Sequence, residues 1–190
     1  MNPEPRDKPR ALKKFNKLRN FLIGGLGGRA RKNIIIATIN RKHKVSGEKE
    51  GLFIKHFLAP KLLQYFKQYP IEIYIEGVNS KGETQLKNRF FGSKPAFDFS
   101  FSSPTTLFST PDFPLGTVGE VKYDKLTFRA FITGLGQVIG YRQAANAEGK
   151  HKSYGYYIFF NTELDKTLTE NEKNFLKELW GKENIFVLVI

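Results

Sequence analysis

Residues 117–123 read TVGEVKY, and the rest of the chain can be interpreted around them. The segment alternates in character and is rich in β-branched and aromatic residues, which predicts a short strand. Side chains two apart on a strand point to the same face, so Val118, Glu120 and Lys122 should share one face. Burying a carboxylate and an ammonium in such an apolar strand is costly unless they have a task. Glu120 and Lys122 therefore mark a candidate functional site.

Two further acidic residues precede this strand. Asp98 lies in PAFDF (residues 95–99), and Asp112 lies in TPDF (residues 110–113). Two carboxylates can hold a hard cation such as Mg²⁺, and a nearby lysine can position or activate an attacking water. Asp112 directly follows a proline, but only seven residues separate it from Glu120, whereas Asp98 leaves 21 residues for a connecting loop. Asp98 is the preferred partner of Glu120, and Asp112 stays open as the alternative.

Residues 127–146 place apolar side chains at helical spacing, which predicts a helix after the strand. Gln137 and Tyr141 are four residues apart and share one face of that helix, with Arg142 beside them. Three glycines in the helix weaken it by about 1 kcal/mol each relative to alanine, which indicates close packing against a neighbouring element.

Together these motifs resemble the PD-(D/E)xK nuclease superfamily, which includes many type II restriction endonucleases and the RecB-like exonucleases. Residues 120–122 (EVK) match its ExK element, and residues 137–141 (QVIGY) match the QxxxY element of several branches. The resemblance covers residues 46–190. It implies an α/β, restriction-endonuclease-like core, in which a central mixed β-sheet is flanked by helices in the order αβββαβ.

The resemblance also implies a role for each residue. Asp98, Glu120 and the Val121 carbonyl would hold Mg²⁺, for which Mn²⁺ could substitute, and Lys122 would orient or deprotonate the attacking water. The implied function is that of an Mg²⁺-dependent deoxyribonuclease, a restriction-type endonuclease that cuts DNA as a homodimer. A repair or recombination nuclease of the same fold remains open.

Supporting roles follow in the same way. Gln137 and Tyr141 would position the scissile strand or the lysine. In this superfamily a helix before the sheet often contributes an acid, which makes Glu50 and Glu48 candidates. Both glutamates also suit the first turn of a helix that begins at Ser46, where the helix dipole favours acids.

The formal net charge is +13, and its distribution is uneven. Residues 1–44 carry thirteen basic side chains against two acidic ones, a net of +11. Such a segment is attracted to a polyanion, although a solvated basic tail is the alternative. We interpret residues 1–45 as a basic extension with a short amphipathic helix at 11–23, and residues 46–190 as the nuclease-like domain. The expected nucleic-acid contacts are Lys13, Lys14, Lys17, Arg19, Arg29, Arg31, Lys32 and Arg142.

Composition excludes several other classes of protein. The absence of cysteine removes disulfides, thiol catalysis and iron–sulfur clusters. No stretch approaches the roughly 18–20 apolar residues of a membrane span, so no membrane association is expected. The glycine-rich residues 24–28 lack the Gly-Lys-Ser/Thr ending of a nucleotide-binding loop. We expect a cytoplasmic protein of prokaryotic, phage or mobile-element origin; the alternative function is non-catalytic nucleic-acid binding, as in a ribosome-associated or architectural factor.

The remaining pattern predicts alternating helices and strands. A helix should continue to Tyr69 with a kink or break at Pro60, and a capping box should start another helix at Thr169. The turn residues 79–82 suggest a hairpin, and the prolines of residues 102–116 suggest a loop. Strands are expected at residues 33–39, 71–76, 86–91, 96–101, 154–160 and 185–190.

Overall fold

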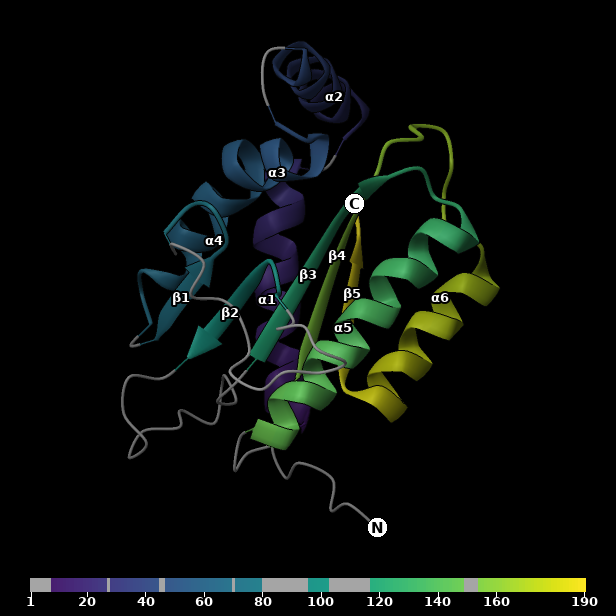
Figure 1. The fold of residues 1–190 in the computed structure, drawn as a ribbon. Helices are drawn as coiled ribbons and strands as arrows, with labels where there is room; N and C mark the ends of the chain where they lie inside the picture. The colour runs from purple at the N-terminus through teal and green to yellow at the C-terminus, as the bar shows by residue number, and fades with distance from the viewer. Residues whose placement is uncertain are drawn as a thin grey trace.

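The computed structural model describes residues 8–26, 28–44, 47–69, 71–79, 96–102, 117–148 and 154–190. At its centre is a mixed five-stranded sheet whose strands follow chain order, β1-β2-β3-β4-β5. Helices pack on both faces of the sheet, which gives three layers (Figure 1). The expected α/β fold with a mixed, helix-flanked sheet is confirmed.

The sheet has an antiparallel half and a parallel half. Pairing is antiparallel from β1 to β3 and parallel from β3 to β5. Every residue of β4 is buried, as its unbroken apolar and aromatic run predicts for a strand covered on both faces. The strands are β1 (Glu72–Ile75), β2 (Phe99–Ser102), β3 (Thr117–Asp124), β4 (Gly155–Asn161) and β5 (Ile185–Val189).

Four helices and a π-helical turn pack with one face of the sheet. They are α1 (Lys8–Leu26), α2 (Arg29–His43), α3 (Lys49–Phe53), the turn η1 (Ile54–Leu58) and α4 (Ala59–Phe66). The ring of Phe15 in α1 stacks on that of Phe186 in β5, with 4.3 Å between centroids. The apolar face of α1 thus belongs to the same hydrophobic core as the sheet. The boundary drawn at residue 45 therefore does not separate two cores.

The strand expected at residues 33–39 is wrong, because this segment is the middle of α2. Ile35 and Ile39 are four residues apart and buried, whereas Ile34 is 63% exposed. Isoleucine is less favourable than alanine in a helix by no more than about 0.7 kcal/mol. Burying one helical face against the core outweighs that preference.

The helix expected to kink or break at Pro60 runs through the π-helical turn η1 into α4. Proline has no N–H to donate to the preceding turn, and the wider turn lies directly before it. Glu48 occupies the N-cap position of α3 without a side-chain capping bond. Ser46, expected to cap this helix, lies outside the described residues.

The other face of the sheet is covered by α5 (Phe128–Glu148) and α6 (Glu170–Glu178), in front of the strands in Figure 1. The capping box at Thr169 is confirmed, and α6 continues into the π-helical turn η2 (Leu179–Glu183). The strand expected at 86–91, and most of the turn at 79–82 and the loop at 102–116, lie outside the described residues. No helix in the part of the chain that the structure describes is both long and apolar enough to cross a membrane.

Candidate active site

The site lies where β3 extends beyond its neighbour β2. Register pairing between the two strands ends at Gly119. Past that point, backbone N–H groups of β3 meet carboxylates instead of a strand. Asp98 Oδ2 accepts a hydrogen bond from the Val121 N–H at 2.6 Å, and Glu50 Oε2 accepts one from the Tyr123 N–H at 3.3 Å. Two acids distant in sequence are thereby fixed along one edge of β3.

Asp98 is held in place by its own backbone, directly before β2. Its N–H donates to the Gly119 carbonyl at 3.0 Å, and its carbonyl accepts from the Glu76 N–H at 2.8 Å. Gly119 is required for this close approach, since a Cβ there would lie 2.1 Å from the Phe99 ring. The glycine before the ExK element thus lets β2 bring Asp98 to β3.

Lys122 connects two of the acids. Its Nζ lies 2.8 Å from Glu120 Oε1 and 3.0 Å from Glu50 Oε1. The Glu120 side chain is only 3% exposed and that of Lys122 20%. On the α5 side, a Cβ at Gly134 would lie 2.7 Å from Lys122 Cγ, so the missing side chain makes room for the lysine stem. The ammonium is therefore positioned by three elements, α3, β3 and α5.

Burial and mutual repulsion change how these groups titrate. Burial raises the pKa of Asp98 to about 7, with repulsion from Glu50 adding to the effect of burial. Burial, with repulsion from Asp98, raises the pKa of Glu120 to about 8. Burial alone would lower the pKa of Lys122, but Glu120 and Glu50 outweigh it and raise that pKa above its ordinary value. Lys122 is thus an ammonium at neutral pH, and Asp98 and Glu120 have too little positive charge beside them.

The charge of the cluster would favour a divalent cation. With Glu50, Asp98 and Glu120 ionised, three negative charges face the single positive charge of Lys122, a deficit of two. Among the described residues, no group of three or more His, Cys, Asp or Glu side chains could hold a metal ion by itself. Mg²⁺, however, is commonly bound through one or two carboxylates, with water and substrate phosphate completing its shell.

The backbone of Val121 adds a further oxygen on the same side. Its N–H points to Asp98, and the N–H and C=O of one strand residue point the same way. The Val121 carbonyl therefore lies on the side of β3 where Asp98 is bound.

The QxxxY pair on α5 faces the same cluster. Burial raises the pKa of Tyr141, and the nearby charges of Glu120 and Asp98 add to the rise. Gln137 Nε2 lies 3.5 Å from Tyr141 Oη, to which it donates. The Tyr141 ring also packs edge-on against Phe97, one residue before Asp98, at 6.5 Å between centroids. The Tyr141 phenol thus lies near the carboxylates, with the Gln137 amide beside it.

Other residues expected at the site are placed differently. Asp112 lies outside the described residues, so only Asp98 is seen beside Glu120. Glu48 is exposed, and Glu50 alone of the two glutamates reaches β3. Arg142 is 7% exposed and pairs with Glu183 at 3.3 Å. Its position links α5 to η2, because a buried guanidinium needs a carboxylate partner, and the expected surface contact with nucleic acid is not supported.

The basic residues expected to contact nucleic acid lie on α1 and α2. Lys13, Lys17 and Arg19 are exposed on α1, where Lys14 lies over the Tyr69 ring. On α2, Arg29 pairs with Asp165, Arg31 donates to the Gly24 carbonyl and Lys32 is partly buried. The far end of α2 adds exposed Arg41 and Lys44. α2 packs on α3, the helix that carries Glu50.

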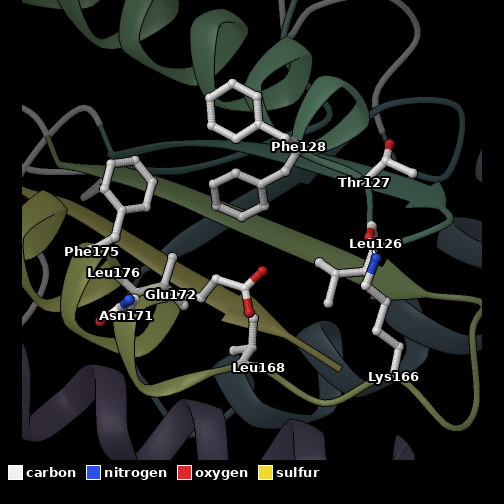
Figure 2. Close-up of a pocket in the computed structure, with 10 residues that line it drawn as sticks. Leu126, Thr127, Phe128, Lys166, Leu168, Asn171, Glu172, Phe175 and Leu176 are labelled. Carbon is white, nitrogen blue, oxygen red and sulfur yellow. Dashed lines mark hydrogen bonds between the residues drawn. The ribbon is translucent and has the colours of Figure 1, made fainter.

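A pocket of about 300 Å³ lies between the first turns of α5 and α6 (Figure 2). Its walls are mainly apolar, and Phe128 at its rim is 79% exposed. The polar groups around it already serve the fold: Lys166 donates to the Leu126 carbonyl, and Glu172 belongs to the capping box. The pocket contains none of the four charged residues at β3, so it offers no acid–base chemistry of that kind.

Four charged residues from three parts of the chain therefore meet at one edge of β3. Glu120 and Lys122 were predictable as a pair, whereas the bond from Glu50 to Tyr123 and the space left by Gly134 carry no sequence signal of their own. Any function inferred for the site must come from this geometry and its chemistry. Comparison of the chain with protein-family models, with curated proteins and with solved structures gave no match.

Proposed function

We propose that this protein is an Mg²⁺-dependent DNA endonuclease of the PD-(D/E)xK type. The observation that carries the proposal is the cluster at β3. Asp98 is half-buried and Glu120 buried, their pKa values are raised to about 7 and about 8, and Lys122 lies 2.8 Å from Glu120. Strongly perturbed acids beside a fixed cation are typical of functional sites. The mixed sheet and the QxxxY residues on α5 agree with the same proposal.

Asp98 and Glu120, with the Val121 carbonyl, would hold Mg²⁺. When bound, the cation supplies Lewis-acid stabilisation of the charge that develops on the phosphate and the leaving oxygen. The charge deficit of the cluster is the reason for proposing a divalent rather than a monovalent ion. Mn²⁺ presents the same charge to the same oxygen ligands.

Lys122 acts in this proposal as a charged donor and not as a base. Its pKa is raised by Glu120 and Glu50, so it keeps its proton at neutral pH. It can donate to a water or to a phosphate oxygen, which favours orienting the nucleophile over deprotonating it. Glu50 acts through Lys122 and is a positioning residue.

DNA is the substrate proposed for the site. Exposed lysines and arginines on α1 and α2 offer the positive charge that phosphates attract, and α2 packs against the helix that carries Glu50. Tyr141 lies near the acids with Gln137 beside it, and the pair could hold the scissile strand through hydrogen bonds. Cutting both strands of a duplex would require two such sites, which is the reason for proposing a homodimer.

The decisive experiment is cleavage of supercoiled plasmid and linear phage DNA with Mg²⁺ or Mn²⁺. Wild type should cut, Glu120→Gln and Lys122→Ala should lose at least about 100-fold in rate, and both variants should still bind DNA. Lys125→Ala is the matched control, because Lys125 is an exposed lysine just beyond the same strand. Circular dichroism and thermal unfolding establish that each variant is folded.

The products distinguish the remaining functions. Discrete bands support a sequence-specific endonuclease, whereas a smear or progressive shortening moves the proposal to repair or recombination. A folded wild type that retards DNA in a gel without cutting it would overturn the nuclease. The basic surfaces of α1 and α2 would then favour a non-catalytic nucleic-acid-binding protein.

A further inference from the structure

The last strand of the sheet has an unusually apolar edge. Among the described residues, β5 pairs with β4 alone, and its sequence is IFVLV. Edge strands normally carry charges, prolines or bulges that prevent pairing with another chain. The five residues of β5 contain no charged residue and no proline. Such an edge is suited to receiving an additional strand.

The outward-facing backbone groups of β5 can be identified. Ile190 donates to the Phe159 carbonyl at 2.9 Å and accepts from the Asn161 N–H at 2.8 Å, so both of its backbone groups point to β4. The direction of these groups alternates along a strand. Those of Val189 and Val187 therefore point away from β4 and are available to an added strand.

A groove runs along this edge. It has a volume of about 490 Å³ and reaches both layers of helices, since α1 and α6 contribute its walls. Figure 1 shows β5 between purple α1 behind the sheet and yellow α6 in front of it. The apolar part of the lining includes Leu12 and Phe15 from α1, and Leu176 and Trp180 from the other wall. Side chains on either face of an added strand would thus find apolar contacts.

The charged residues that line the groove are all basic. They are Arg19 on α1 and Lys173 and Lys177 on α6, each exposed, and Lys173 pairs with Glu170 at 2.5 Å. A second copy of this chain, paired through its own β5, would bring further copies of Arg19 and Lys177 against them. Like charges in an interface oppose association, and opposite charges favour it. The charge of the groove therefore selects an acidic occupant over a second copy.

We propose that the β5 edge is a docking site for an extended acidic segment of a partner protein. The segment adds a sixth strand through Val187 and Val189, places apolar side chains against Leu176 and Trp180, and places acidic side chains beside Arg19 and Lys177. This proposal is independent of nuclease activity. Its site shares no residue with the cluster at β3.

Trp180 provides the measurement, because it is the only tryptophan of the chain and lines the groove. The probe is a short blocked peptide of repeating Val-Val-Glu-Glu, which carries valine and glutamate on both faces of a strand, titrated while tryptophan fluorescence is recorded. Saturable binding is expected. The same peptide with lysine in place of glutamate should not bind, nor should the acidic peptide with N-methylated backbone amides, since it cannot complete a β-ladder.

Variants separate this site from general attraction to a basic protein. Lys177→Glu and Arg19→Glu, on opposite walls, should each weaken binding by about fivefold or more at low salt. Lys182→Glu is the control, because Lys182 is exposed nearby and does not line the groove. Equal weakening by all three variants, or equal binding of the acidic and basic peptides, would overturn the proposal.

Hydrogen exchange tests the backbone pairing directly. The Val187 and Val189 amides should exchange rapidly in the protein alone and become protected when the acidic peptide binds. Protection without peptide at every protein concentration would mean that the chain itself covers the edge. Protection that appears only at high protein concentration would mean that a second copy does. Either result rejects the acidic partner.

Discussion

Lys122 and Glu50 are 72 residues apart in the chain, yet the lysine donates to the glutamate at 3.0 Å. The same carboxylate also accepts a hydrogen bond from the Tyr123 N–H, so Glu50 fixes both a side chain and the backbone of β3. A lysine side chain is otherwise rotationally free, and this clamp reduces that freedom. Glu50 therefore helps to decide where the ammonium stands relative to Asp98 and Glu120.

Replacing Glu50 should separate positioning from folding. In Glu50→Gln, an amide is a weaker partner for an ammonium, and we expect DNA cleavage to fall by about 10-fold to 100-fold in kcat. DNA affinity should not change. Glu48→Gln is the control, because Glu48 is exposed and caps α3 only through its backbone. Equal activity of the two variants would show that Glu50 does not position Lys122.

The glycines of α5 provide a matched pair of substitutions. A Cβ at Gly134 would lie 2.5 Å from Tyr157 Oη and 2.7 Å from Lys122 Cγ, whereas a Cβ at Gly136 meets nothing within 4 Å. We expect Gly134→Ala to lower the free energy of unfolding by about 1–3 kcal/mol and to reduce cleavage, because the lysine stem must move. Gly136→Ala should instead stabilise α5 by about 1 kcal/mol and leave cleavage unchanged. Chemical denaturation and plasmid cleavage should be measured for both variants side by side. If Gly134→Ala changes neither the free energy of unfolding nor the cleavage rate, the close contact of Gly134 with Tyr157 and Lys122 is contradicted.

The raised acid pKa values make the free energy of unfolding depend on pH. Burial raises the pKa of Asp98 to about 7 and that of Glu120 to about 8 in the folded protein, against about 4 in an unfolded chain. Between these values the folded state binds more protons, so the free energy of unfolding should fall as pH rises from about 4 to 8. In metal-free buffer we expect a loss of several kcal/mol, because each pH unit over which the folded state holds one extra proton costs about 1.4 kcal/mol. In the double variant Asp98→Asn, Glu120→Gln, the free energy of unfolding should change less over the same pH range. If its slope against pH matches that of the wild type, these two acids are not the source of the pH dependence.

A divalent cation should reverse that loss. Mg²⁺ requires ionised carboxylates, so its binding should release protons and raise the melting temperature more at pH 8 than at pH 6. At a free Mg²⁺ concentration ten times the dissociation constant, the free energy of unfolding should rise by about 1.4 kcal/mol. Differential scanning calorimetry at constant ionic strength measures the shift without relying on activity. If Glu120→Gln gains as much from Mg²⁺ as the wild type, the cation binds elsewhere.

The basic end of α2 should contribute to DNA affinity without contributing to catalysis. Arg41 and Lys44 are exposed there, next to the helix that carries Glu50. Arg41→Glu with Lys44→Glu should weaken DNA binding and lower the slope of log K against log salt by about one for each phosphate that the protein no longer neutralises. The matched control is Lys182→Glu, on an exposed surface of η2. A salt slope identical in both variants would move the DNA-binding surface away from α2.

Many helices and strands could be predicted from local sequence, because the local pattern of each favours the structure that the segment adopts in the folded protein. The alternating run around Glu120, the aromatic run of β4 and the capping box at Thr169 each formed the predicted element. Residues 33–39 did not, because three consecutive isoleucines favour a strand locally, and only burial of Ile35 and Ile39 on the core makes the segment helical. Local preference is weak enough for packing to reverse it.

The sequence by itself determined which groups are chemically notable: an acid and a lysine two residues apart on a strand, an acid within an aromatic run, and a glutamine and tyrosine one helical turn apart. Tertiary structure alone decided which of them meet. Asp98 and Glu50 reach β3 because the pairing with β2 stops at Gly119 and leaves backbone N–H groups of β3 for carboxylates. Arg142 is buried and pairs with Glu183. Spacing along the chain fixes the face of one element, but distances between elements depend on how their apolar surfaces pack.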